Sequence, residues 1–325
     1  MTNPQGQSGE RTGAKGGADE AWTTRRLLGW MSDAFARNGL DSPRLFAELL
    51  MSHVIGCDRL RLYMEADRPA TPLERQRLRE LAARALKHEP VQYLVGEGWF
   101  FGLPFHVDPR VLIPRPSTET IVEQVLLHSR AEPGFGGKTG EGVRLADVCT
   151  GSGCIAISLL KQLPKAEAVA MDISPEALAV AARNAERHKV TDRIEFLDGD
   201  LLAPLSDHPS GAGVGGFHYI VSNPPYIPDH EWESPDPSCG VARNVRDFEP
   251  HLALRGGADG LQYIRPLIEQ APAHLKVGGL LVIETAASTA ERVLALMTAS
   301  SGLGNVRLAN DGEGLPRVVI GSRVV

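Results

Sequence analysis

The fold of this chain is decided by the stretch Arg144-Leu145-Ala146-Asp147-Val148-Cys149-Thr150-Gly151-Ser152-Gly153. Its first half is apolar enough for a buried strand, and its two glycines allow a tight turn in which the backbone approaches a ligand. An apolar run from Cys154 to Leu163 follows and has the length of a helix. The stretch therefore predicts a strand, a ligand-binding turn and a helix in immediate succession.

The same alternation continues beyond this unit. Strands are predicted at residues 144–148, 168–171, 194–197, 219–221 and 280–283, and near Val306 and Val318. Helices are predicted near 118–128 and at 154–163, 175–188, 261–275 and 289–299. This pattern indicates an α/β fold in which a parallel sheet is covered by helices on both faces. Ligands in such sheets bind at the carboxyl ends of the strands.

Residues 21–95 have a helical pattern instead. A first helix stops at Gly39, Ser42-Pro43 is predicted to cap the next one, and Thr71 with Glu74 forms a capping box for a third. The second of these helices is predicted to bury the face made of Leu45, Phe46, Leu49, Leu50 and His53. We therefore expect a small helical domain at residues 21–95.

Three further segments complete the predicted organisation. Residues 1–20 are rich in Gly, Ser, Asn and Gln, and we expect a disordered tail. Residues 96–112 hold aromatic and β-branched side chains around Gly102 and Pro104, which favours a β-hairpin linker. Residues 113–325 then form the large α/β domain. No apolar run approaches the roughly 18 residues that a membrane span needs.

Composition and charge narrow the classes of partner. Cys57, Cys149, Cys154 and Cys239 form no C-x-x-C pair, so we expect neither a metal site nor a disulfide framework, and a reducing cytoplasm fits best. Residues 21–95 have 12 Lys/Arg against 9 Asp/Glu, a balance of +3, and residues 1–20 have a balance of −1. Because the whole chain has a formal net charge of −6, residues 96–325 carry a net charge of −8. Such a balance argues against stable capture of a nucleic-acid backbone.

Two acidic residues follow the next strands. Asp172 lies 19 residues beyond Gly153, where a carboxylate can accept both hydroxyls of a ribose, and Asp200 follows the third strand. Gly151-x-Gly153-x-x-Ala156 also satisfies the relaxed fingerprint of a dinucleotide site. Taken alone, these residues fit a nicotinamide cofactor almost as well as an adenosyl one.

The tetrad Asn223-Pro224-Pro225-Tyr226 follows the fourth strand and favours the adenosyl cofactor. The Asn223 amide oxygen and the Pro224 carbonyl can accept the two N–H bonds of a substrate NH2 group. Two consecutive prolines end the strand and remove two backbone donors, and Tyr226 offers a flat face to a planar group. The tetrad predicts methyl transfer onto a planar nitrogen and has no role in hydride transfer.

Together these motifs resemble class I S-adenosylmethionine-dependent methyltransferases, and in detail the HemK/PrmC family. The resemblance also includes residues 89–96 (EPVQYLVG), 111–116 (VLIPRP), 248–250 (FEP) and 259–261 (DGL). It implies a Rossmann-like methyltransferase sheet preceded by a helical domain that recognises the substrate. The implied activity is methylation of the side-chain amide of the glutamine in the GGQ motif of class I peptide chain release factors, which are the implied partners.

The resemblance also assigns roles to residues. It places the cofactor against Cys149, Thr150, Gly151, Ser152, Gly153, Asp172, Asp200, Leu201 and Asn223. It places the glutamine amide against Asn223, Pro224, Pro225 and Tyr226. The chain departs from the family at Cys149, where Gly is frequent, and at Ser117, where an acid is frequent. Arg115 and Glu249 lie in family-like segments, and their contact with substrate is left open.

Three alternatives to release-factor methylation remain at this point. A related branch with the same tetrad methylates glutamine in a ribosomal protein, although Pro114-Arg115-Pro116 and Phe248-Glu249-Pro250 favour the release-factor branch. The tetrad would equally hold the exocyclic amine of an adenine in DNA or RNA, which the charge of −8 disfavours. A non-catalytic adenosyl-binding module would need neither Asn223 nor Tyr226.

Overall fold

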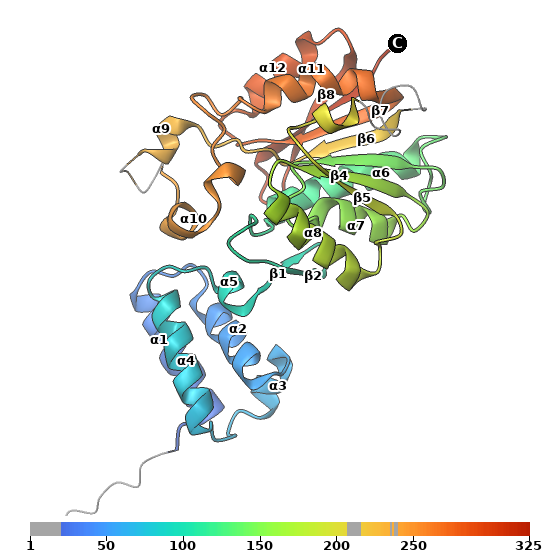
Figure 1. The fold of residues 1–325 in the computed structure, drawn as a ribbon. Helices are drawn as coiled ribbons and strands as arrows, with labels where there is room; N and C mark the ends of the chain where they lie inside the picture. The colour runs from blue at the N-terminus through green and yellow to red at the C-terminus, as the bar shows by residue number, and fades with distance from the viewer. Residues whose placement is uncertain (1–20, 207–215, 235, 237–239) are drawn as a thin grey trace, which may run out of the picture. The chain divides into compact units, whose positions relative to one another are not determined.

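The computed structural model describes residues 21–206, 216–234, 236 and 240–325 (Figure 1). The predicted tail, residues 1–20, lies outside the described residues. The chain divides into two compact units, Met1–Leu86 and Lys87–Val325. The domain boundary expected from the sequence, after residue 95, stays a prediction; the short helix α5 (Val91–Val95) lies within the second compact unit.

Four helices make up the described part of the first unit. They are α1 (Thr24–Arg37), α2 (Pro43–Ile55), α3 (Arg59–Met64) and α4 (Pro72–Ala85). The capping box at α4 is confirmed, because Thr71 Oγ1 accepts from the Glu74 backbone N–H at 3.2 Å and Glu74 Oε2 accepts from the Thr71 N–H at 2.8 Å. The cap expected at α2 is wrong in part: Ser42 precedes Pro43, but its side chain makes no capping hydrogen bond.

The buried face of α2 differs from the predicted one. Ala47, Leu50 and Met51 are fully buried, whereas Leu45 is 36% exposed and His53 is exposed. The face has turned to include Glu48, which is buried because the Arg59 Nη2 and Arg44 Nε groups bind its two carboxylate oxygens at 2.6 and 3.0 Å. Apolar spacing alone missed this face, since an ion pair and not a hydrocarbon side chain completes it.

The predicted hairpin is present in the second unit. Strands β1 (Glu97–Phe100) and β2 (Leu103–His106) pair antiparallel, with Phe100 opposite Leu103. The hairpin is fixed to helix α8 (Pro175–His188), because Asn184 Oδ1 accepts from the His106 N–H at 2.7 Å and its Nδ2 donates to the His106 carbonyl at 3.0 Å. Phe100 and Phe105 join the core of the large domain.

The main sheet has the order β5-β4-β3-β6-β7-β9-β8 (Figure 1). Its strands are β3 (Arg144–Val148), β4 (Glu167–Asp172), β5 (Ile194–Asp198), β6 (Phe217–Ser222), β7 (Leu275–Glu284), β8 (Leu303–Asn310) and β9 (Pro316–Arg323). The first five in this order are parallel, while β9 is antiparallel to both β7 and β8. The order reverses between β3 and β6, and the carboxyl ends there flank a ligand crevice.

Helices cover both faces of the sheet. One face carries α6 (Glu119–Ala131), α7 (Cys154–Gln162) and α8, and the other carries α11 (Ile264–His274) and α12 (Ala290–Ala299), as Figure 1 shows for the labelled helices. Each strand divides its side chains between two apolar clusters: Leu280 and Val282 of β7 belong to one, and Leu281 and Ile283 to the other. The predicted α/β class, with a Rossmann-like sheet buried on both sides, is confirmed.

Short elements before α6, after β5 and after β6 complete the domain. They are the 3₁₀ turns Pro116–Thr118, Ala203–Leu205 and His251–Ala253, and the helices α9 (Asp229–Trp232) and α10 (Arg243–Phe248). No helix within the described ranges has the length and apolar character to cross a membrane.

Candidate active site

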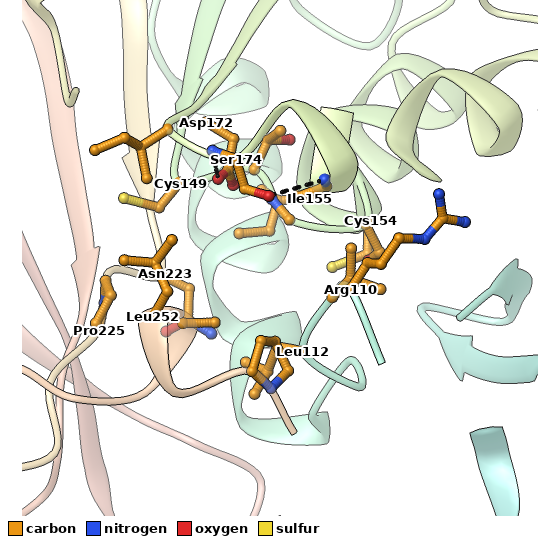
Figure 2. A pocket seen from close by; sticks show the side chains of 18 of the residues that line it. Arg110, Leu112, Cys149, Cys154, Ile155, Asp172, Ser174, Asn223, Pro225 and Leu252 are labelled. Carbon is orange, nitrogen blue, oxygen red and sulfur yellow. Dashed lines mark hydrogen bonds between the residues drawn. The ribbon is translucent and has the colours of Figure 1, made fainter. Parts of the chain in front are cut away.

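A cavity opens at the carboxyl ends of β3, β4, β5 and β6. Its empty space is about 970 Å³, including solvent at the mouth. Figure 2 shows Asp172, Ser174 and Cys149 at one end, and Asn223, Pro225 and Leu252 toward the other. The predicted residues that line it are Cys149, Thr150, Gly151, Ser152, Asp172, Asp200, Leu201, Asn223 and Pro225. The structure thus brings together residues from four separate strand ends.

The turn after β3 leaves room along the cavity wall. Cys149, Gly151 and Gly153 have φ values of +60°, +54° and +79°. A Cβ added at Gly151 would meet no described protein atom within 4 Å, although Gly151 lines the cavity. Gly153 is not among the described lining residues; a Cβ there would lie 2.9 Å from Ile157 Cδ1, so this glycine serves the close packing of α7.

Asp147 holds this turn from beneath. The side chain is fully buried, and its Oδ2 accepts from Thr150 Oγ1 at 2.7 Å and from the Ala156 N–H at 3.1 Å. Its Oδ1 has no hydrogen-bond partner among the described residues. Burial raises the pKa of Asp147 to about 7, and the two hydrogen bonds partly oppose that rise. The carboxylate therefore links the turn to the first turn of α7.

Asp172 stands at the end of β4 and faces the same turn. Its Oδ2 accepts from the Gly151 N–H at 2.8 Å and its Oδ1 from the Ser174 N–H at 3.0 Å. Burial raises the pKa of Asp172 above its ordinary value, and these two hydrogen bonds offset only part of that rise. Each carboxylate oxygen retains a lone pair for a further donor, which suits a pair of ligand hydroxyls. Asp200 is exposed and lies beside Leu201, whose φ is +48°.

The tetrad follows β6 directly. Ser222 Oγ donates to the Val148 carbonyl at 2.8 Å, which ties the end of β6 to that of β3. Asn223 Nδ2 donates to Thr118 Oγ1 at 3.1 Å, so its Oδ1 is left to accept from a ligand. No backbone N–H of the described residues donates to the Pro224 carbonyl. The tetrad therefore begins with acceptors on two consecutive residues.

A second cavity adjoins the first on the far side of Asn223. Its empty space is about 790 Å³, and Tyr226 lines it together with residues of the segments 227–231 and 240–254. The two cavities share Leu112, Arg115, Asn223 and Ala253 as wall residues. Asn223 thus stands at the boundary between two adjoining spaces. Pro224 is among the described lining residues of neither one.

Arg115 and Glu249 form an ion pair at this boundary. The Arg115 guanidinium donates to Glu249 Oε1, and the Ile113 N–H donates to Glu249 Oε2 at 3.1 Å. Glu249 is 3% exposed and lines neither cavity in the described part of the chain, so its carboxylate fixes the segment around Arg115. Of the two, Arg115 alone lines a cavity.

Two polar residues beneath the tetrad were not predicted from the sequence. Thr118 accepts from Asn223, and the fully buried Glu284 at the end of β7 accepts from Tyr226 Oη at 3.3 Å. A signal for Glu284 was present: it directly follows the apolar run Leu280-Leu281-Val282-Ile283, at the carboxyl end of a predicted strand. Thr118 had no such signal, because its role depends on a contact across 105 residues of sequence.

Comparison with known proteins agrees with this geometry. Residues 26–96 match the family described as PrmC N-terminal domain, and residues 136–234 match the methyltransferase small domain. A release factor glutamine methyltransferase of Geobacter sulfurreducens is 42% identical over 93% of this chain and 97% of its own length. One of Chlorobaculum tepidum is 40% identical over 92% and 97%. The resemblance drawn from the motifs is confirmed: the chain belongs to the family of release factor glutamine methyltransferases.

Proposed function

We propose that this methyltransferase transfers a methyl group from S-adenosylmethionine to the side-chain amide nitrogen of the GGQ glutamine in class I peptide chain release factors. The observation that carries the proposal is the position of Asn223. This residue lines both cavities, and its own NH2 group donates a hydrogen bond to Thr118. An amide oxygen at that boundary is placed to hold a substrate NH2 group against a cofactor in the neighbouring space.

The first cavity has the donor set that an adenosyl cofactor needs. Asp172 would accept from the ribose hydroxyls, and Asp200 with Leu201 would border the adenine. The open wall at Gly151 and the neighbouring Cys149, Thr150 and Ser152 would run along the methionine part, and Asn223 would close the far end. When bound, S-adenosylmethionine supplies an electrophilic methyl group, whose loss leaves the bonding electrons on sulfur.

The chain's own contribution is to hold the amide. An amide nitrogen is a weak nucleophile because its lone pair is delocalised into the carbonyl group. Asn223 Oδ1 and the Pro224 carbonyl would accept its two N–H bonds and stabilise positive charge that develops on nitrogen. Tyr226, with Pro225 beside it, would pack on the flat amide. One N–H proton then passes to water or to a backbone acceptor. The helical first unit contributes to recognition of the release factor.

The assay compares acceptors under one set of conditions. The protein is incubated with S-adenosylmethionine labelled in its methyl group and with a class I release factor, a ribosomal protein or nucleic acid, and the label is located. We expect label on the release factor, and none on a release factor whose GGQ glutamine is replaced by alanine. Label on nucleic acid alone, or on the ribosomal protein alone, would overturn the proposal. An absence of label on all three acceptors would overturn it as well, because no methyl transfer would have occurred.

Asp172 offers a test of the cofactor half by itself. Replacing Asp172 by alanine removes the acceptor for the Gly151 and Ser174 N–H groups as well as that for the ribose. Hydrogen bonds to a charged group contribute about 1.5–3 kcal/mol, so the Kd for S-adenosylmethionine should rise about 10- to 100-fold. Isothermal titration calorimetry measures this change.

The matched control is Asp198→Ala. Asp198 pairs with Asp172 in the sheet register and ends the neighbouring strand, but it is exposed and is not among the described cavity residues. Its removal should leave the Kd unchanged. Equal weakening by both substitutions would show that the general charge of this sheet edge, and not a specific contact of Asp172, governs binding.

A further inference from the structure

The fully buried carboxylate of Glu284 collects hydroxyl groups from both sides of the tetrad. Its Oε1 accepts from Ser117 Oγ at 3.1 Å and from Tyr226 Oη at 3.3 Å. The neighbouring Thr118 hydroxyl also lowers the pKa of this carboxyl, which is the direction expected of a hydroxyl that donates to it. Its Oε2 has no partner among the described residues. A buried carboxylate costs free energy unless hydrogen bonds compensate for the lost solvent, so these hydroxyl donors are needed where they lie.

The hydroxyl of Thr118 has one proton, and this decides the direction of its hydrogen bonds. Thr118 Oγ1 accepts from Asn223 Nδ2 at 3.1 Å, so its own proton needs another acceptor, and the buried Glu284 carboxylate, whose pKa this hydroxyl lowers, supplies one. Asn223 must therefore turn its NH2 group toward Thr118 and keep its Oδ1 for another donor. Thr118 is only 2% exposed, so water does not readily replace either of its partners.

We propose that Glu284 is a positioning residue that sets the orientation of the Asn223 amide through Thr118 and holds Tyr226 in place through its hydroxyl. The inference rests on the proposed function, in which Asn223 must accept from a substrate NH2 group. With the amide reversed, Asn223 would present its own N–H bonds to those of the substrate, and two donors do not bind each other.

Glu284→Met tests this role, because methionine fills a similar shape but accepts no strong hydrogen bond. Thr118 is then free to donate its proton to Asn223 Oδ1, so the amide loses its fixed direction. We expect kcat for release-factor methylation to fall about 10- to 100-fold, the usual effect of removing a supporting partner. The Kd for S-adenosylmethionine should not change, because Glu284 is not among the described residues that line the cofactor cavity.

Three further variants separate positioning from general disturbance. Thr118→Val breaks the same connection between Glu284 and Asn223 and should lower kcat to a similar extent. Thr118→Ser keeps the hydroxyl, so kcat should stay close to the wild-type value. Ser117→Ala removes another donor to the same carboxylate without touching Asn223, and kcat should be nearly unchanged. The double variant Glu284→Met/Thr118→Val should be no slower than Glu284→Met, because both substitutions break one chain of hydrogen bonds. Wild-type kcat in Glu284→Met, or an equal loss in Ser117→Ala, would overturn the role of Glu284.

A readout without substrate distinguishes failure of this inference from failure of the proposed function. In ¹⁵N-labelled protein, the side-chain NH2 resonances of Asn223, identified by their loss in Asn223→Ala, should shift in Glu284→Met and Thr118→Val but not in Ser117→Ala. If the wild-type protein methylates no release factor, the proposed function fails, and these resonances alone decide the orientation of the amide. Unshifted resonances in Glu284→Met would show that Glu284 does not set it.

Discussion

Replacing Asn223 by alanine is expected to lower kcat for release-factor methylation by about 10²- to 10³-fold, the effect typical of removing one preorganised group from a developing charge. The loss arises because Oδ1 is one of two acceptors for the substrate NH2 group, and the Pro224 carbonyl alone cannot fix its orientation. Single-turnover kinetics with labelled S-adenosylmethionine measures the effect directly.

Two comparisons show whether that loss is specific. The Kd for S-adenosylmethionine should remain close to that of the wild-type protein, since most of the first cavity is formed by other residues. Tyr226→Phe keeps the ring of the same tetrad and removes only a hydroxyl that reaches Glu284 at 3.3 Å, so it should lose far less activity. If Asn223→Ala turns over at the wild-type rate, Asn223 has no part in catalysis.

Replacing Gly260 by alanine is expected to disturb both stability and activity. Gly260 has a φ of +77°, and an added Cβ would lie 2.6 Å from the backbone carbonyl oxygen of Tyr226 and 3.1 Å from Pro228 Cγ. The positive φ costs about 1–3 kcal/mol, and relief of the clash must move the backbone of the tetrad. We expect a loss of about 2–4 kcal/mol in the free energy of unfolding, measured by urea denaturation.

The activity of the Gly260 variant should fall by more than the fraction of unfolded protein accounts for. A displacement of about 1 Å at a reacting group reduces the rate by roughly 10²-fold. The matched control is Gly257→Ala, whose φ of +79° is nearly the same but whose added Cβ has side-chain atoms of Gln262 as its three nearest neighbours, with Oε1 closest at 2.5 Å. That variant should show the backbone strain and retain most of the activity. Equal inactivation of the two variants would remove the contact with Tyr226 from the explanation.

Much of the cofactor site follows from the sequence because its residues occupy one repeated position. Asp172, Asp200 and Asn223 each come just after a predicted strand, and parallel strands bring their carboxyl ends to one edge of the sheet. The strand and helix order of the large domain was predicted for the same reason. The bounds were less accurate: β7 begins at Leu275, five residues before the predicted strand, because Gly278 and Gly279 obscure its pattern.

The supporting residues could not be predicted in the same way. Thr118 lies in a short 3₁₀ turn, and nothing in its neighbours indicates a contact with Asn223. The face of α2 was misjudged because Glu48 is buried only through Arg44 and Arg59, one of which is on the next helix. Helix α10 has six residues and no buried side chain, so it has no apolar period to detect. Long-range polar contacts thus escaped detection where strand ends did not.

The place of β9 in the sheet has a consequence for synthesis of the chain. Among the described strands, β8 pairs with β9 alone, yet it precedes β9 in sequence, so during translation it emerges before its partner exists. Until β9 emerges, β7 remains an open edge, and the last rung of their ladder joins Glu284 to Val318. Glu284 therefore gains its register partner on β9 only after residues 316–323 have been made, whereas the strands that flank the cofactor turn, β3, β4 and β6, all precede β9 in the chain.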